Sequence, residues 1–532
     1  MRPEIEACRP VEQLRQWPVG AEPVCSVLFC CRRHRPDLVE QQPAYFRDLN
    51  LDQVVAMLTS GREEYDLAPY FYTRLRAAHA VSYRQEVLAD LDRQPLQAAV
   101  AGFASAMRRV RLQLWHATGL RYERERQCWR VQAARTYTEA VTSLAGDLDR
   151  AGPASAGLRA FRGYLAGYLA SEGFTNLVAD TVRMLDRLAT VGYRLHILGL
   201  SITVSLDGEE DGGDYSTRVA ATFERFRQGA VDSHRMRFLD PVGLNHVEAG
   251  VLDRVVRLYP DVFSDLARYC DRHAGFLDHT VTTFDRQVQF YLAYLDHVAP
   301  LRQAGLPFCY PEVDLSKQVS LRDTFDLPLA GKLVAAGKEV VVNDLHLSGR
   351  ERFLVVTGAN QGGKTTLART FGQVHHLAGI GCLVPGREAK LHLCDQLFTH
   401  FPRAEKLADL RGRLQDDLLR MRDILRRATG DSVVITNELF GSTALADATL
   451  LGTRILQHMI DRDLLGVYVT FVDELSRLGE ATVSMVATVA ADDPAVRTFK
   501  VVRQPADGLA HALAIAEKYQ LTRELIEKRF AS

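Results

Sequence analysis

The chain has 532 residues, 47% hydrophobic and 25% charged, which is the composition of a globular protein with room for roughly two to four domains. Its formal net charge of −1 excludes a globally basic nucleic-acid coat, so any DNA contact must come from a local patch. Nine scattered cysteines, an N-terminus without a signal pattern and the lack of an apolar run of about 18–20 residues predict a cytoplasmic protein with no membrane partner.

Residues 1–45 hold several prolines and one short apolar run, Val24 to Phe29, and are predicted to form a small extended cap. One cysteine–histidine cluster lies here: Cys25, Cys30, Cys31 and His34. Its C-x4-C-C-x2-H spacing is not a recognised zinc pattern, so small buried side chains are the simpler interpretation.

Residues 46–307 are predicted to be mainly helical, because apolar residues recur at three- and four-residue spacing. The segment Tyr193 to Phe223 interrupts this pattern with β-branched, partly alternating residues and an acidic, glycine-rich turn at Asp207 to Asp214. These features indicate a β-hairpin inside a helical domain.

A basic stretch lies near the start of the helical region, with eight arginines against Glu123 and Glu125. The first seven are the candidate DNA contacts Arg108, Arg109, Arg111, Arg121, Arg124, Arg126 and Arg130, and the eighth is Arg135. Four aromatic residues lie in or beside the stretch: Trp115, Tyr122, Trp129 and Tyr137. Arginines interleaved with aromatic rings can hold phosphates and stack on bases, although a solvated helix face has the same composition.

A phosphate-binding loop is predicted from Gly358 to Thr365, which reads G-x-x-x-x-G-K-T directly after the β-type run Phe353 to Thr357. Glycines let backbone N–H groups surround an anion, and the helix that follows adds its dipole. Lys364 can reach the β- and γ-phosphates of ATP, and the Thr365 hydroxyl can ligate Mg²⁺. A glycine-rich turn would explain the glycines but not Lys364 with Thr365. The candidate ATP contacts are Gly358, Asn360, Gly362, Gly363, Lys364, Thr365 and Thr366.

The form G-x-N-x-G-G-K-T resembles the loop of the MutS family of DNA mismatch-repair ATPases. Further segments keep that family's order along the chain: residues 308–313, 340–347, 377–401 with the motif D-Q-L-F-T, 424–443, 470–475 and 505–519. The collinear resemblance runs from about residue 308 to the C-terminus.

The resemblance implies a multidomain fold: a cap over 1–45, a mainly α-helical lever over 46–307 with a reduced β-hairpin clamp at about 193–223, and an α/β P-loop ATPase domain of ABC type over 308–532. The family reads mismatches with a Phe-x-Glu motif, and this sequence contains no Phe-x-Glu. We therefore expect a short member that lacks the mismatch-reading domain.

The resemblance also assigns catalytic roles. Glu438 would orient or deprotonate the attacking water, and Asn437 would support Mg²⁺ through water where most of the family has Asp. Phe471 stands where the family usually has His. The alternative is that Phe471 simply packs under the nucleotide loop. Both departures predict slow ATP hydrolysis. Gly412, at the start of a helix, would complete the partner subunit's site in trans, which implies an obligate dimer for turnover; an ordinary amphipathic helix is the alternative. A homodimer is expected, although the sequence leaves a heterodimer open.

The sequence thus predicts an ATP-dependent DNA-binding protein of repair or recombination, with ATP and Mg²⁺ as cofactors and with duplex or branched DNA and repair proteins as partners. The alternative is a nucleotide-dependent switch or scaffold with a protein partner and little hydrolysis. Carboxylates at Glu209, Glu210 and Asp211 favour this alternative, because they would repel DNA phosphates. An SMC-like ATPase is disfavoured because no long heptad array is present.

Overall fold

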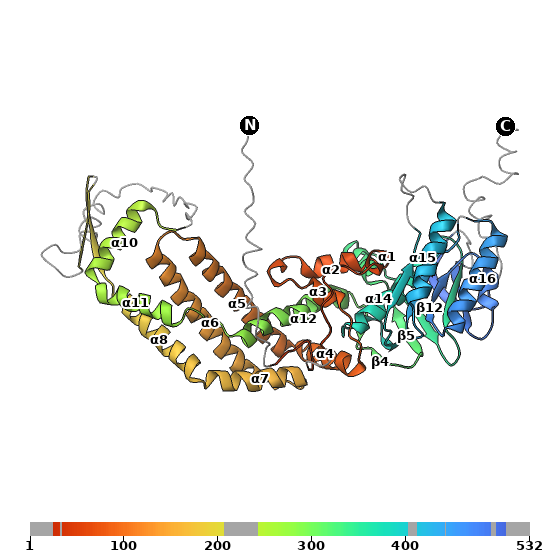
Figure 1. The fold of residues 1–532 in the computed structure, drawn as a ribbon, viewed down its shortest axis with the longest axis horizontal. Coiled ribbons are helices and arrows are strands. Elements are labelled where there is room, and N and C mark those ends of the chain that lie inside the picture. The colour runs from red at the N-terminus through yellow and green to blue at the C-terminus, as the bar shows by residue number, and fades with distance from the viewer. Residues whose placement is uncertain are drawn as a thin grey trace, which may run out of the picture. The chain divides into compact units, whose positions relative to one another are not determined.

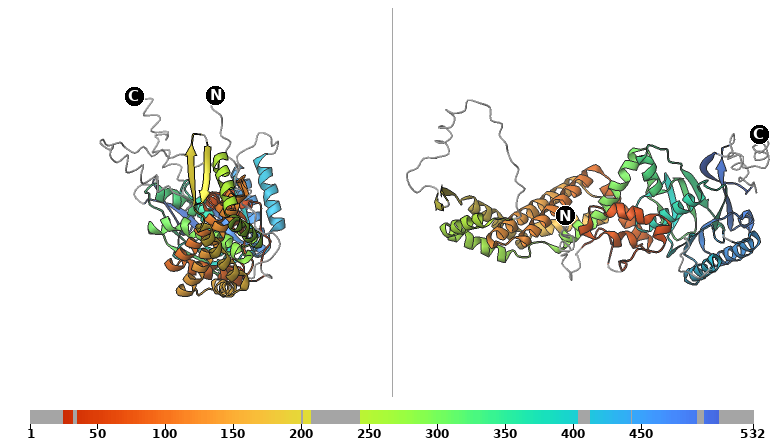
Figure 2. Two further views of the ribbon diagram at one scale, coloured as in Figure 1. Left: turned by 90° about the vertical axis from the view of Figure 1, so that its left-hand side faces the viewer. Right: turned by 90° about the horizontal axis from the view of Figure 1, so that it is seen from above.

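The computed structural model describes residues 25–31, 35–199, 201–206, 243–402, 412–441, 443–490 and 496–506 (Figures 1 and 2). These residues belong to two compact units. The first contains residues 98–152 and 162–285, and the second contains residues 25–97, 153–161 and the chain from 286 onward. In the described ranges, no helix has the length and apolar character needed to span a bilayer.

The first unit is built from helices and one β-hairpin. Its helices, in whole or in part, are α5 (Gln94–Gly119), α6 (Glu123–Ala151), α7 (Ala156–Leu169), α8 (Glu172–Ala189), α10 (His246–Leu258), α11 (Pro260–Arg272) and α12 (His279–Gln303). Local capping sets two of the starts: Ser171 accepts from the Phe174 N–H of α8 at 3.3 Å, and Asn245 and Glu248 form a capping box on α10. α6 packs against α8 and α11, and its Tyr137 is fully buried.

The β-hairpin consists of β1 (Tyr193–Leu198) and β2 (Ser201–Leu206), which pair antiparallel with Leu198 opposite Ser201. These two residues therefore flank a short turn, in which Gly199 adopts a φ of 60°, as hairpin turns favour. This turn lies earlier than the predicted one, because a single glycine with positive φ suffices to reverse the chain. The acidic segment 207–214 lies outside the described residues.

The second unit begins with short helices that pack on its α/β part: α1 (Tyr45–Asp48), α2 (Leu51–Thr59), η3 (Glu63–Tyr65), α3 (Ala68–Tyr72) and α4 (Ala78–Leu91). Arg369 Nε donates to the Asp48 carbonyl at 2.9 Å, and Gln373 Nε2 donates to the Leu49 carbonyl at 2.9 Å. Residues 46–97 therefore belong to the same compact unit as the phosphate loop, whereas the sequence analysis grouped them with the helical lever.

The entry into the α/β part forms two small sheets. A four-stranded sheet has the order β4 (Glu312–Asp314), β9 (Glu388–His392), β5 (Val319–Thr324) and β6 (Asn343–Leu347). A two-stranded sheet pairs β3 (Phe308–Cys309) with β8 (Val384–Pro385), and α13 (Leu327–Ala335) follows β5 in the chain.

The central sheet has six strands in the order β10 (Leu397–His400), β11 (Val433–Asn437), β12 (Leu465–Val469), β7 (Phe353–Gly358), β13 (Thr482–Val489) and β14 (Arg497–Arg503). All neighbours are parallel except β13 and β14. β11 and β12 are buried along their whole length, as apolar runs in a covered parallel sheet should be. The fold is therefore mixed helical and α/β, as predicted.

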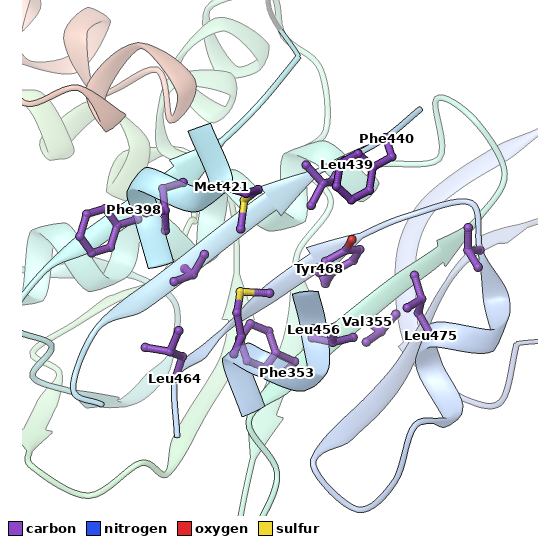
Figure 3. Close-up of a cluster of buried hydrophobic side chains, with 14 of the residues drawn as sticks. Phe353, Val355, Phe398, Met421, Leu439, Phe440, Leu456, Leu464, Tyr468 and Leu475 are labelled. Carbon is purple, nitrogen blue, oxygen red and sulfur yellow. The ribbon is translucent and has the colours of Figure 1, made fainter. Parts of the chain in front are cut away.

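Helices cover both faces of the central sheet. α14 (Lys364–Gly379) packs on one face, where a Cβ added at Gly372 would lie 2.6 Å from Ile435 Cδ1. α15 (Arg413–Arg427) and α16 (Leu445–Asp461) cover the other face. Figure 3 shows the core on that side, where Phe353 and Tyr468 of the sheet meet Met421 of α15 and Leu456 of α16. The short helix η4 (Asp473–Arg477) closes the end of this core.

Candidate nucleotide-binding site

The phosphate loop joins β7 to α14, and its glycines adopt conformations that other residues avoid. Gly358 has a φ of 102°, and a Cβ there would lie 2.8 Å from the Ala487 carbonyl oxygen. Gly363, the N-cap of α14, has a φ of 95°. The strand, the loop and the helix N-terminus thus follow each other in the order that an anion site requires.

Lys364 is bound by the loop that precedes it. Its Nζ donates to the Gly358 carbonyl at 2.6 Å, to Asn360 Oδ1 at 3.2 Å and to the Ala359 carbonyl at 3.3 Å. Burial lowers the pKa of Lys364, and the nearby Glu438 carboxylate acts in the opposite direction. All three acceptors are neutral, so the anionic oxygens of a triphosphate would compete well for this ammonium group.

The two residues predicted to support Mg²⁺ are in contact. Thr365 Oγ1 donates to Asn437 Oδ1 at 2.9 Å, although 72 positions separate them in the sequence. Asn437 ends β11 and is 5% exposed. A hydroxyl and an amide oxygen are hard ligands that suit Mg²⁺, but neither carries a charge. Among the described residues, no group of three or more His, Cys, Asp and Glu side chains could hold a metal ion.

Glu438 follows Asn437 in a strained turn. Its φ is 51°, in the left-handed region, and Phe440 two residues later has a φ of 63°. The Glu438 N–H donates to the Val469 carbonyl at 2.9 Å, and Phe440 is fully buried as an anchor. Such conformations cost on the order of 1–3 kcal/mol each for a non-glycine residue and are typical of functional sites. The Glu438 side chain is exposed.

Phe471 lies beside the turn that carries Glu438. Its side chain is 46% exposed, and its Cε1 lies 4.0 Å from the position of a Cβ on Gly441. Nearly half of the ring surface is therefore open to solvent.

Two site residues were missed by the sequence analysis. Arg497 Nε donates to the Asn360 carbonyl at 3.1 Å, and the Phe499 carbonyl lies 3.3 Å from the position of a Cβ on Gly363. Both belong to β14, which pairs with β13 next to the phosphate loop. The alternating apolar and polar residues after residue 481 were the sequence signal for strands in this region. Only the strand order of the central sheet places these strands beside the loop.

Gly412 is the N-cap of α15, with a φ of −69° and a ψ of 151°. Its carbonyl accepts from the Gln415 N–H at 3.0 Å and from the Asp416 N–H at 3.2 Å. A Cβ at Gly412 would meet nothing within 4 Å, so its surroundings are open within the described part of the chain. The predicted helix start is present, and its role in trans stays a prediction.

The arginines of the stretch differ in burial and in their hydrogen-bond partners. Arg111 forms an ion pair with the buried Asp285, and Arg124 donates to Gln127 Oε1 at 2.9 Å and to the Phe263 carbonyl at 3.2 Å. Arg126 is half-buried. Four arginines are exposed among the predicted DNA contacts: Arg108, Arg109, Arg121 and Arg130. Tyr137 is fully buried and cannot stack on a base.

Comparison with known proteins finds similarity over the C-terminal part of the chain. Residues 354–530 match the family model described as MutS domain V. The DNA mismatch repair protein MutS of Clostridium kluyveri is 24% identical over 247 residues, which are 44% of this chain and 28% of that protein.

The C-terminal part of this chain is similar to domain V of MutS proteins. The MutS protein of Chlorobium phaeovibrioides is 23% identical over 284 residues, covering 52% of this chain and 31% of the relative. That of Oleidesulfovibrio alaskensis is 32% identical over 138 residues, covering 26% of this chain and 15% of the relative. The chain thus spans less than a third of the length of these MutS relatives in each alignment. MutS family proteins are ATPases, which agrees with a phosphate loop built around Lys364.

Proposed function

We propose that this chain binds ATP with Mg²⁺ at residues 358–366 and hydrolyses it slowly, and that the nucleotide gates its binding of DNA in repair or recombination. The observation that carries the proposal is the hydrogen bond of 2.9 Å between Thr365 Oγ1 and Asn437 Oδ1. It brings the end of β11, and with it Glu438, to the phosphate loop.

Each residue has a defined task in this proposal. Lys364 and the loop N–H groups bind the phosphates, and Thr365 and Asn437 orient the metal. Mg²⁺ held by these residues would supply positive charge that offsets the charge of the phosphates. Glu438, exposed directly after β11, holds the attacking water and takes its proton. Asn437 contributes no charge and Phe471 donates no proton, so turnover is slow.

The DNA partner rests on the family and on the four exposed arginines. Members of the family act on DNA, and Arg108, Arg109, Arg121 and Arg130 are accessible for phosphate contacts. The chain would act as a dimer with composite sites, in which Gly412 of one subunit faces the phosphate loop of the other. Mismatch reading is not part of the proposal.

ATP turnover with and without DNA tests the function. Turnover would be measured with homoduplex, mismatched and branched DNA for the wild type, for Glu438→Ala and for the matched control Glu480→Ala. The carboxylate of Glu480 is exposed beside Arg350. We expect one DNA class to stimulate turnover in the wild type and in Glu480→Ala but not in Glu438→Ala. Turnover that survives in Glu438→Ala would contradict the assigned catalytic role.

A second candidate is a nucleotide-dependent switch with a protein partner and almost no hydrolysis. It is favoured by the uncharged Asn437 at the Mg²⁺ position and by the exposed Phe471 beside the catalytic turn. Tight ATP binding that is lost in Lys364→Met, together with no turnover and no DNA binding, would select this function over the first.

A further inference from the structure

A groove lies between α15 and α16 on the face of the central sheet away from α14. Its volume is about 550 Å³. Figure 1 labels the two helices, and the right-hand view of Figure 2 shows them side by side. None of the residues that line it belongs to the proposed nucleotide site, so the groove requires a separate explanation.

The floor of the groove is apolar. Leu418, Met421 and Leu425 lie on one face of α15 at helical spacing, and Ile455 faces them from α16. Met421 is 1% exposed and belongs to the core, whereas Leu418 is 37% exposed. The floor is therefore continuous with the core but open to a partner, and methionine adapts easily to different side chains.

The rim of the groove is basic. Arg422 and Arg426 line it from α15, and His458 and Arg462 line it from the other side. No acidic side chain is among its lining residues in the described part of the chain. Arg462 donates to the Leu425 carbonyl and so bridges the two helices at the end of the groove.

Within the described residues, one ion pair is formed by the arginines of this rim. Asp423 contacts Arg422 at 3.3 Å, and both side chains are more than half exposed, at 62% and 58%. Exposed ion pairs contribute little to stability, so Arg422 can exchange this neighbour for a partner's carboxylate at little cost. The carboxylates on either side of Arg462 have other partners: Asp461 accepts from Gln457 at 2.8 Å, and Asp463 pairs with Lys317 and Arg352.

We propose that this groove docks an acidic amphipathic helix of a protein partner. Apolar side chains at i, i+3, i+4 and i+7 would contact the floor of Leu418, Met421 and Ile455, as in other helix-in-groove complexes. Flanking carboxylates would pair with the guanidinium groups of the rim, which bind carboxylates in a fork geometry. A nucleic acid would satisfy the arginines but would leave the apolar floor uncovered.

The test uses the full chain and a fluorescein-labelled helix-forming peptide about 15 residues long, with Leu at the four anchor positions and Glu beside them. Fluorescence anisotropy would measure its binding to wild type, to Arg422→Gln/Arg426→Gln and to the matched control Arg454→Gln. Arg454 is exposed on α16 but does not line the groove. We expect micromolar binding that falls by about tenfold or more in the double variant and is unchanged in the control.

A second variant, Leu418→Ser, tests the apolar floor without a change of charge, and it should weaken binding by about fivefold or more. We expect these variants to stay folded, because the side chains of Arg422, Arg426 and Leu418 are exposed. Circular dichroism would check this.

Five outcomes would overturn the proposal. The first four are no binding at about 100 µM peptide, equal loss in Arg454→Gln, equal binding of a scrambled peptide, and a change in the oligomeric state of Arg422→Gln/Arg426→Gln without peptide. The fourth would identify a second copy of this chain as the occupant. The fifth is displacement of the peptide by single-stranded DNA through Arg422 and Arg426, which would identify a nucleic-acid site instead.

Discussion

Thr365 Oγ1 and Asn437 Oδ1 form a hydrogen bond of 2.9 Å that joins the start of α14 to the end of β11. An Asp at position 437 could accept the same bond while adding a negative charge beside the metal position. We therefore propose that the neutral amide weakens Mg²⁺ binding at this site.

Replacement Asn437→Asp should tighten Mg²⁺ binding. A carboxylate strengthens metal and hydrogen-bond contacts, and we expect the Mg²⁺ concentration for half-maximal turnover to fall by about tenfold. A Mg²⁺ titration of ATP turnover measures this. The control Thr365→Val removes the hydroxyl and should weaken Mg²⁺ binding in both backgrounds. An unchanged titration in Asn437→Asp would show that the amide does not support the metal.

Replacement Phe471→His should raise turnover. The side chain is 46% exposed beside the Glu438 turn, so an imidazole fits there without creating a cavity. A proton donor at this point is expected to increase kcat by about tenfold, and the gain should follow the titration of the imidazole. Phe471→Leu, which adds no donor, should leave kcat unchanged. Equal rates in the two variants would remove Phe471 from the account of slow hydrolysis.

Mixing two inactive variants tests the composite site. Lys364→Met destroys a subunit's own loop but leaves its Gly412 intact, whereas Gly412→Asp does the reverse by placing a carboxylate near the partner's phosphates. In a mixed dimer, the loop of the second subunit meets the Gly412 of the first. After subunit exchange, about half of the dimers are mixed, and each of these has one intact composite site. Turnover per dimer should therefore recover to about half of the rate of one wild-type site. A mixture that stays as inactive as its components would exclude the role of Gly412 in trans.

Two buried histidines on α14 should make the protein sensitive to acid. His376 Nε2 donates to the Phe71 carbonyl at 3.0 Å, and its Nδ1 accepts from the Tyr45 hydroxyl at 3.0 Å, so the neutral ring is fully bonded. Burial lowers the pKa of His375 and of His376 to about 3.

The sign of the effect follows from these values. The unfolded chain binds protons below about pH 6.5 while the folded chain does not, so the free energy of unfolding falls as the pH drops from 6.5 towards 3. Each histidine contributes a slope of up to about 1.4 kcal/mol per pH unit. Urea unfolding between pH 6.5 and 5, above the carboxylate range, measures it. His376→Gln should reduce the slope by about half, and an unaltered slope would refute the assignment.

The four exposed arginines should determine the salt dependence of DNA binding. Replacement of Arg108, Arg109, Arg121 and Arg130 by Ala should reduce the slope of log K against log salt by about 3–4 if each contacts a duplex phosphate. The control is Arg150→Ala, an arginine 80% exposed on α6 outside the stretch. An equal slope in wild type and quadruple variant would assign these residues to a solvated helix face.

Local features of the site could be predicted because neighbouring residues decide them. The β7 strand, the glycine conformations at Gly358 and Gly363 and the start of α14 at Lys364 depend on a contiguous segment. The hairpin turn was predicted less well, since Gly199 allowed a shorter turn than the acidic segment suggested.

The sequence by itself determined the phosphate loop, the helical and α/β parts of the chain, and the resemblance of its C-terminal part to MutS proteins. The tertiary structure decided what meets the loop. The strand order β11, β12, β7, β13, β14 brings Asn437 to Thr365 and Arg497 to Asn360. The tertiary structure also pairs Arg111 with the buried Asp285 and joins His376 to Tyr45 by a hydrogen bond. Such contacts join residues far apart in the chain, so they depend on the packing of whole elements and on the exclusion of water, which no local pattern encodes.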